Sequence, residues 1–544
     1  MKNILKISVV TLAAATILSG CVKETFPEGG SATADQVAKS PFALKAMVNG
    51  IPAAMMKVNT AGYYKTYGVH TDFGMPAIHI MTENMLEDVA TAGDNPYYNR
   101  FYNYTMNSGM GETYIYCAYF WDCYYPWIKG CNDVISLIDP ATATEETIGY
   151  LGQALAYRAM FYLDLARLFE PKENNYTDVS SVLGLTVPIV TNLTTPDEGK
   201  HNPRASHDEI YTFILNDLKL AEEYLANVSY SYTSPTLGVV YGLYARAYIE
   251  MGAAGDSDAY TKAAEYARKA ITTSGCTPLT QAQWEDPKTG FNSGSSNKSW
   301  MWGTTLASEQ TGNLMNFSAH MSSEASWGYA PLAHISANKR FYEQINDKDF
   351  RKHSWIDPLR DEFYQYQING DRTAYMETVM DYEAIKFRPA QGETKDYAVG
   401  ACADHPLMRV EEMYFIEMEA TAHSNLGTAR TLLNNFMKLR ILDGSYDCTS
   451  KTGSLESFLT EMLFQKRVEF WGEGILIFDY KRLNAGITRG YAGTNHPGVY
   501  RFNTTGRAPF WNIVITRGES QSNVGITTET NNPDPSGTVP QWFQ

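Results

Sequence analysis

Apolar side chains recur every three or four residues along most of the chain between Asp35 and Gly472, the spacing of one buried face of an α-helix. The clearest stripe predicts a helix from about Thr147 to Phe169 that ends before Pro171. Its face-forming residues are Leu151, Leu155, Arg158, Tyr162, Leu165 and Phe169. Similar stripes run through Tyr114–Ile138, His207–Leu225, Leu237–Met251, Tyr260–Ile271, Val410–Ala422, Ala429–Ile441 and Leu455–Trp471.

Several of these stripes come as neighbouring pairs joined by a short polar turn. Asp256–Asp258 separates two Ala/Tyr-rich helices, and Ser424–Gly427 separates two later ones. Paired helices that each bury one face against the next are typical of a tetratricopeptide-like stack, although no strict repeat of ~34 residues is visible. We therefore predict a mainly α fold over residues 35–544, with tetratricopeptide-like helix pairs, a loop-rich second half and minor β structure.

Three regions interrupt the helical pattern: Thr60–Gly111, Trp284–Pro331 and an irregular tail over residues 484–544. The tail contains one strand-like run, Phe510–Thr516. Long loops in a compact helical protein usually either carry the function or lack order. Aromatic residues make up 13% of the chain, and their density in the first two loops favours an ordered, functional role.

The residue types in these two loops suit sugar binding. A sugar ring has apolar C–H faces that pack on an aromatic ring, while amide and carboxylate side chains bond the hydroxyls at its rim. Trp300 and Trp302 alternate as in a strand and are expected to share a face, and Tyr97, Tyr98 and Arg100 crowd one turn. For any single aromatic residue, the alternative is that it only packs its loop onto the helical core.

The N-terminus has the pattern of a bacterial export signal. Two lysines precede an apolar run, Ile7–Leu18, which is too short to span a bilayer as a mature helix but suits a signal peptide. The small residues before Cys21 resemble a lipobox, in which this cysteine is lipidated. We predict a lipoprotein signal peptide over residues 1–20 and a polar tether over residues 21–34, with ordinary cleavage beside an incidental cysteine as the alternative.

Charge and motifs exclude several classes of function. With 44 Lys+Arg against 60 Asp+Glu, the formal net charge is −16 and no basic run exceeds short pairs, which argues against nucleic acid or an anionic membrane surface as partner. The ten histidines are scattered without an HExxH motif, and there is no nucleotide-binding loop, so neither a metal nor a nucleotide cofactor is indicated. The six cysteines after Cys21 form no CxxC, and we predict mostly buried free thiols.

Catalysis has one set of candidates near the C-terminal helices. Glu469, Glu473 and Asp479 include pairs that would suit a glycosidase, which needs two carboxylates ~5–9 Å apart. Arg and Lys residues interleave with them in similar numbers, which favours a structural ion-pair network instead. A surface glycoside hydrolase is therefore kept as an alternative function, and a purely structural lipoprotein as a third.

Several stretches, taken in order, resemble the SusD/RagB family, surface lipoproteins that bind nutrients for a SusC-like TonB-dependent transporter. They are Trp121–Asn132, Gly152–Phe169, Pro203–Tyr211, Met408–Tyr414 with Glu419–Ala420, and Lys466–Gly474 with Phe478–Asp479 and Lys481–Arg482. No single stretch is specific, but with the lipobox they follow the family order from end to end. Leu476 is a departure, because many members carry arginine there, and it weakens a structural ion pair.

The resemblance implies four tetratricopeptide-like helix pairs, a buried and paired Arg158, and no catalysis or cofactor. It implies that an oligosaccharide lies on an aromatic arc formed by loops 60–111 and 284–331. By position the arc residues are Asp72, Tyr97, Tyr98, Arg100, Trp300, Trp302, Trp327 and Tyr329. We therefore expect a lipid-anchored, surface-exposed outer-membrane protein that delivers glycan to a SusC-like transporter, with a peptide ligand as the near alternative.

Overall fold

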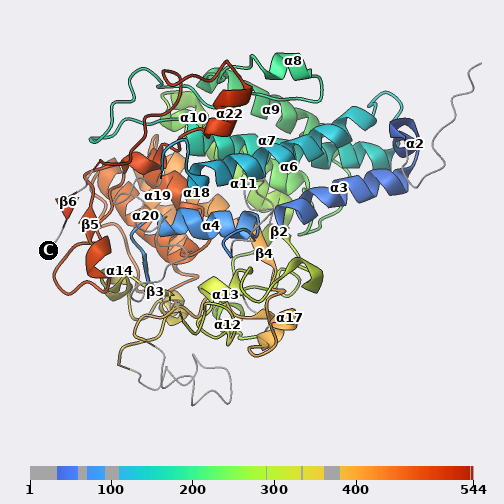
Figure 1. Cartoon of the computed structure of the whole chain (residues 1–544). Helices are drawn as coiled ribbons and strands as arrows, with labels where there is room; N and C mark the ends of the chain where they lie inside the picture. Colours follow the sequence, from blue (N-terminus) through green and yellow to red (C-terminus); the bar gives the residue numbers. More distant parts are fainter. Residues whose placement is uncertain are drawn as a thin grey trace, which may run out of the picture.

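A computed structural model describes residues 33–58, 70–91, 110–288, 291–332, 335–359, 380–538 and 541–542. Over these residues the chain is mainly helical (Figure 1). Long helices form the upper part of the view, and the short helices α12, α13 and α17 lie among loops in its lower part. The predicted fold class is thereby confirmed.

Each long helix packs against the next one along the chain: α6 on α7, α7 on α9, α9 on α10, α10 on α11, and α11 on α18, which pairs with α19. Their bounds are α3 (Pro41–Met55), α6 (Ile115–Leu137), α7 (Glu145–Phe169), α9 (His207–Tyr224), α10 (Leu237–Ala253), α11 (Ser257–Ser274), α18 (Val410–Ala422), α19 (Leu426–Met437) and α20 (Leu455–Phe470). The predicted turns between paired helices are present after α10 and after α18. This succession confirms the tetratricopeptide-like pairing.

Helix α7 is the centre of the stack, and its sequence sets its limits. It begins after Thr144, whose side chain caps the first turn, and ends two residues before Pro171. In its middle, Arg158 pairs with Asp217 of α9 at 2.7 Å and donates a hydrogen bond to Asn132 of α6 at 2.8 Å. The expected buried, paired arginine is confirmed, and it connects three helices.

Short helices and loops form a second layer on this stack. The short α-helices are α2 (Ala34–Ala38), α4 (Met75–Asn84), α8 (Pro196–Gly199), α12 (Gln281–Glu285), α13 (Ser318–Met321), α14 (Lys339–Gln344), α17 (Tyr397–Gly400), α21 (Leu476–Arg482) and α22 (Arg517–Ser522). Single 3₁₀ turns are η2 (Ser308–Gln310), η3 (Phe350–Ser354), η4 (Ala390–Gly392), η5 (Gly498–Tyr500) and η6 (Pro509–Trp511).

Antiparallel strand pairs join parts of this layer that are far apart in the sequence. They are β1 (Val89–Thr91) with β3 (Ile335–Ala337), β2 (Trp300–Thr304) with β4 (His405–Arg409), and β5 (Phe502–Asn503) with β6 (Gln541–Trp542). The pair of β2 and β4 places the second loop region against the start of α18, where the Val410 N–H donates to the Ser299 carbonyl at 2.8 Å. The loops are thus anchored to the helical stack by backbone pairing.

The strand predicted for Phe510–Thr516 is wrong. The chain there begins as the turn η6 and continues as extended backbone with no strand partner among the described residues. The side chain of Asn531 takes the place of a strand, since its Oδ1 accepts the Ile515 N–H and its Nδ2 donates to the Ile515 carbonyl, both at 2.9 Å. The apolar run is buried in the core. Its backbone groups need hydrogen-bond partners there, and a side-chain amide can supply them as a neighbouring strand would.

The cysteines agree with the sequence expectation. All six that the structure describes are free, and five of them are buried, three on α6. Cys402, between α17 and β4, is partly exposed. The prediction of mostly buried free thiols is confirmed.

Glu83, at the end of α4, makes stability depend on pH. It is fully buried, and burial raises its pKa from 4.5 to about 8. The folded protein therefore holds a proton that the unfolded chain releases above about pH 4.5, so the free energy of unfolding falls as the pH rises from about 4.5 to about 8. We expect Glu83→Gln to equal the wild type near pH 4 and to exceed it by about 2–5 kcal/mol at pH 8.5.

Urea unfolding across this pH range measures the effect. Glu265→Gln, at an exposed position of α11, is the matched control and is expected to leave the pH profile unchanged. Parallel profiles for wild type and Glu83→Gln would contradict the raised pKa of Glu83.

Candidate functional site

The two predicted ligand loops meet at a group of ring side chains, His70, Phe73, His320 and Tyr329, which we call the aromatic junction. The ring of His320, on α13, stacks on Phe73 with centroids 5.5 Å apart and on Tyr329 with centroids 5.0 Å apart. The Tyr329 hydroxyl is hydrogen-bonded to Nδ1 of His70. The junction therefore joins the first loop region to the second.

The junction has an uncharged imidazole at its centre. Burial lowers the pKa of His320 to about 4, and its Nε2 is 3.0 Å from the carbonyl oxygen of Leu314, to which it donates. Tyr329 keeps 8% of its surface exposed. Aromatic rings with polar atoms at their edges are suited to an uncharged, hydroxyl-rich ligand.

Trp327 lies beside the junction but is packed inward. It is 5% exposed and belongs to a small apolar cluster with Ala319, Ala325 and Ala401. A Cβ atom on Gly400 would lie 2.4 Å from its ring, so α17 approaches the indole through a glycine. In this arrangement Trp327 fixes the second loop region onto α17.

Asp72 holds the first loop region to the helical stack. It is fully buried, and its Oδ1 accepts a hydrogen bond from the Tyr119 hydroxyl of α6 at 3.1 Å. Burial and the nearby Asp72 carboxylate together raise the pKa of Asp122 to about 6. Asp72 acts as an internal anchor here, with no surface open to solvent.

Trp300 and Trp302 are fully buried, and neither offers a ring face to a ligand in this structure. The register of β2 against β4 shifts between them, so their surroundings differ. Trp302 contacts Tyr157 of α7 at a centroid distance of 4.9 Å, whereas Trp300 lies 6.5 Å from Tyr232. The alternation of Trp300 and Trp302 correctly predicts a strand, but it does not predict whether their rings are exposed.

The remaining predicted residues lie outside the described part of the chain. These are Tyr97, Tyr98 and Arg100 of the first loop region and the lipidation residue Cys21. In the residues that are described, no group of three or more His, Cys, Asp or Glu side chains is arranged to hold a metal ion. None of the described helices is both long and apolar enough to cross a bilayer.

Sequence reasoning missed the two histidines of the junction. His70 and His320 fall inside the predicted loops, but the sequence pattern points to histidine only as a potential metal ligand. The available signal was their position, each within ten residues of a predicted ligand residue, Asp72 or Tyr329. Their stacking depends on two segments far apart in the sequence and could not be read from either one alone.

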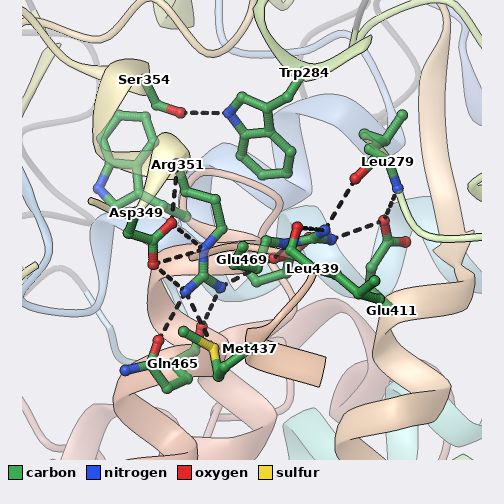
Figure 2. Close-up of polar contacts among 12 residues, drawn as sticks. Leu279, Trp284, Asp349, Arg351, Ser354, Glu411, Met437, Leu439, Gln465 and Glu469 are labelled. Carbon is green, nitrogen blue, oxygen red and sulfur yellow. Dashed lines mark hydrogen bonds and ion pairs between the residues drawn. The ribbon is translucent and has the colours of Figure 1, made fainter. Parts of the chain in front are cut away.

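The carboxylates proposed as catalytic candidates are buried and ion-paired, and Figure 2 shows the surroundings of one of them, Glu469. Glu469 contacts Arg351 at 3.1 Å, Arg409 at 3.2 Å and Arg440 at 2.8 Å, and its side chain has no exposed surface. Figure 2 shows Arg351 held between Asp349 and Glu469. These arginines overcome the effect of burial and lower the pKa of Glu469, which is the opposite of what a general acid requires.

The other two candidates are engaged in the same way. Glu473 is bound by Arg409 at 2.9 Å and by Lys386 at 2.8 Å, and Asp479 by Lys466 at 2.8 Å. The interpretation of this region as a structural ion-pair network is confirmed.

Comparison with known proteins agrees with this architecture. A SusD-like family model, described as starch-binding associating with outer membrane, matches residues 62–249. A SusD-like carbohydrate-binding protein of Bacteroides vulgatus superimposes with a TM-score of 0.69 at 21% sequence identity, over 90% of this chain and 98% of that one. The chain therefore has the SusD-like fold, and its residues 62–249 match the SusD-like family model.

Other solved structures share this fold. A putative sugar-binding protein of Bacteroides vulgatus has 20% identity and a TM-score of 0.67, covering 92% of this chain and 98% of that one. Surface glycan-binding protein A of Bacteroides thetaiotaomicron, solved with laminarihexaose, has 17% identity and a TM-score of 0.63, covering 90% and 98%. No curated protein sequence matches the chain.

The family match covers one of the two loop regions of the chain. Residues 62–249 include nearly all of the first loop region and the helices from α6 into α10. The second loop region, 284–331, lies beyond the match, and there the likeness is one of fold.

Proposed function

We propose that this chain is a cell-surface glycan-binding lipoprotein, anchored in the outer membrane through Cys21, that delivers oligosaccharide to a SusC-like TonB-dependent transporter without cleaving it. The observation that carries the proposal is the SusD-like likeness in both sequence and fold. The burial and ion pairing of Glu469 support the non-enzymatic part, because its carboxylate is closed to a substrate.

The ligand in this proposal lies over the first loop region where it borders the aromatic junction. Tyr97, Tyr98 and Arg100 are assigned to ligand contact, together with the small exposed part of Tyr329. Asp72 and the three predicted tryptophans, Trp300, Trp302 and Trp327, are assigned to support of the loops because they are buried.

Calorimetric titration of the chain lacking residues 1–21 tests this assignment. The probes are neutral oligosaccharides, including laminarihexaose and maltohexaose, and the recovered ligand is checked for cleavage by mass spectrometry. We expect saturable binding with intact ligand. Tyr97→Ala combined with Tyr98→Ala is expected to weaken binding about tenfold or more at unchanged Tm, because stacked rings carry much of the affinity.

Trp302→Ala is the contrasting variant. Removing a fully buried tryptophan is expected to lower the free energy of unfolding by about 3–5 kcal/mol, which a Tm measurement detects. Unchanged affinity in the double tyrosine variant would contradict the placement of the ligand. Cleaved ligand would contradict the non-enzymatic assignment, and binding of peptides in place of glycans would favour the peptide alternative.

A further inference from the structure

An open cavity of about 480 Å³ lies in the loop layer, and no residue of the aromatic junction lines it. Its walls come from three segments: residues 286–288 with 291–296 after α12, residues 386–391, and residues 402–404 before β4. Its volume falls within the range of small-ligand pockets, roughly 300–1,000 Å³. The mechanism proposed above makes no use of it.

The cavity wall presents many groups that bond hydroxyls. They are the side chains of Asn292, Ser293, Ser295, Ser296, Gln391 and Asp404. Serine hydroxyls and amides can each donate and accept, as sugar hydroxyls do, and the carboxylate of Asp404 accepts. Such a wall matches a ligand that is rich in hydroxyl groups.

The charges at this wall are largely balanced, which disfavours a charged ligand. Lys386 is fully buried and bound to Glu473 at 2.8 Å, and Arg388 lies 3.5 Å from Glu324. Each of these cations therefore has a carboxylate partner outside the cavity. Of the charged residues that remain in the wall, the exposed Lys288 stands against two carboxylates, Asp286 and Asp404, and this small negative excess opposes an anionic ligand.

Two of the polar groups are held in place before any ligand binds. Oδ2 of Asp404 accepts the Gly294 N–H at 3.0 Å and the Tyr232 hydroxyl at 3.3 Å. Oδ1 of Asn292 accepts a hydrogen bond from the backbone N–H of Arg388 at 3.0 Å, so the side-chain amide nitrogen of Asn292 keeps a fixed direction. Groups fixed in this way lose little freedom when they bond a ligand.

Gln391 has a backbone conformation that its side chain does not favour. Its φ is 57° and that of the following Gly392 is 69°, both in the left-handed region. For a residue with a Cβ atom this conformation costs about 1–2 kcal/mol, which glycine would avoid. The exposed glutamine side chain at the cavity wall is therefore kept at a cost in stability, as strained residues at ligand sites often are.

The cavity is separated from the aromatic junction by Trp327 and α17. Trp327 packs against Gly400 and Ala401, and the next three residues, 402–404, line the cavity. A ligand in the cavity therefore contacts a different wall from a ligand at the junction.

We propose that this cavity is a second carbohydrate site, separate from the one at the aromatic junction, and that it takes uncharged sugar units. Asp404, Asn292 and Gln391 bond the hydroxyls, and the serines Ser293 and Ser296 complete the wall. The inference goes beyond the proposed function, which places its ligand on the other side of Trp327.

Hydrogen-exchange mass spectrometry on the full mature chain tests the site, with laminarihexaose and maltohexaose as neutral probes and an oligogalacturonate as the charged one. Peptides from 291–296 and 386–404 report on the cavity, and peptides from 318–330 report on the junction. We expect a neutral hexasaccharide to slow exchange in the cavity peptides. We expect oligogalacturonate to leave their exchange unchanged.

Gln391→Gly separates binding from folding, because it relieves the left-handed strain and removes the amide. Its Tm is expected to equal or exceed that of the wild type. The apparent affinity for the hexasaccharide, measured from the protection of the cavity peptides, is expected to fall at least tenfold. Asp404→Asn, which keeps an acceptor for the Gly294 N–H, is expected to weaken the same protection. Lys298→Gln, at an exposed position of the same segment that does not line the cavity, is the control and is expected to change neither.

Protection confined to the junction peptides would overturn the cavity proposal and leave the proposed function standing. Protection confined to the cavity would support it and contradict the junction. Absence of protection by either hexasaccharide at both places would overturn both, and stronger cavity protection by oligogalacturonate would overturn the preference for uncharged sugar. Full protection in Gln391→Gly and Asp404→Asn would also overturn the cavity proposal.

Discussion

Glu469→Gln is expected to lower the free energy of unfolding by about 3–5 kcal/mol, because it removes the one carboxylate that contacts Arg351, Arg409 and Arg440 together. All four side chains are essentially without exposed surface, so water cannot replace the lost charge. Urea unfolding at neutral pH measures the effect. The change is large against the total stability of an ordinary domain, about 5–15 kcal/mol.

The matched control is Glu343→Gln, because Glu343 forms only an exposed pair with Lys339 at 3.8 Å. Its effect is expected to stay below about 1 kcal/mol. Equal effects of the two substitutions would contradict the burial of the network. Because folding lowers the pKa of Glu469, its charge stabilises the protein fully at pH values above the ordinary glutamate pKa. This stabilisation is lost as the pH falls toward the lower pKa of the folded state.

One practical result concerns the glycosidase alternative. Loss of activity in Glu469→Gln would follow from unfolding as readily as from lost catalysis, so this variant does not identify a catalytic residue. The recovered ligand decides the matter, since intact oligosaccharide after prolonged incubation excludes cleavage wherever the catalytic group lies.

Gly474→Ala is expected to destabilise the fold by about 2–5 kcal/mol. Its φ of 74° is left-handed, and a Cβ atom there would lie 2.3 Å from the Cα of His79 in α4. The strain of a left-handed alanine, about 1–2 kcal/mol, adds to the cost of displacing the α4 backbone, about 1–3 kcal/mol. The displacement would also strain the bond from the Gly474 N–H to Glu83, which is 3.1 Å long. Thermal unfolding and soluble yield measure the result.

Gly444→Ala separates the two contributions. Gly444 has a similar φ of 70°, but a Cβ atom there would meet no atom within 4 Å. Its substitution is expected to cost only the left-handed strain, about 1–2 kcal/mol. Equal losses at the two glycines would contradict the close approach of α4 to Gly474.

The helical scaffold could be predicted from the sequence because its signals are local. The spacing of apolar residues placed α7 and its end before Pro171, and the short polar turns placed the breaks after α10 and α18. The interleaved charges around Glu469 likewise indicated an ion-pair network, although its main partners Arg351, Arg409 and Arg440 lie on other segments.

The candidate site could be predicted only as two regions of the chain. Alternation in Trp300–Trp302 indicates a strand, but the burial of that strand depends on β4, about a hundred residues later. The junction between His320 and Phe73, and the cavity wall at Asp404, also need segments that meet only in the folded chain. Aromatic composition located the loops and could not tell a packing ring from a ligand platform.

The contacts of Asp88 join segments that are very far apart along the chain, and this affects how the protein folds. Its carboxylate receives a hydrogen bond of 2.7 Å from Arg467, which is 379 residues further along the chain, and its carbonyl receives one of 2.8 Å from Trp471. Contacts of such long range form late, after loop closure, and slow the folding of the segments that make them. Helix α4, in which every residue except His79 is buried, is therefore synthesised long before the helices that cover it. Throughout that interval the apolar side chains of α4 lack the helices that bury them in the folded protein, and this exposure favours aggregation.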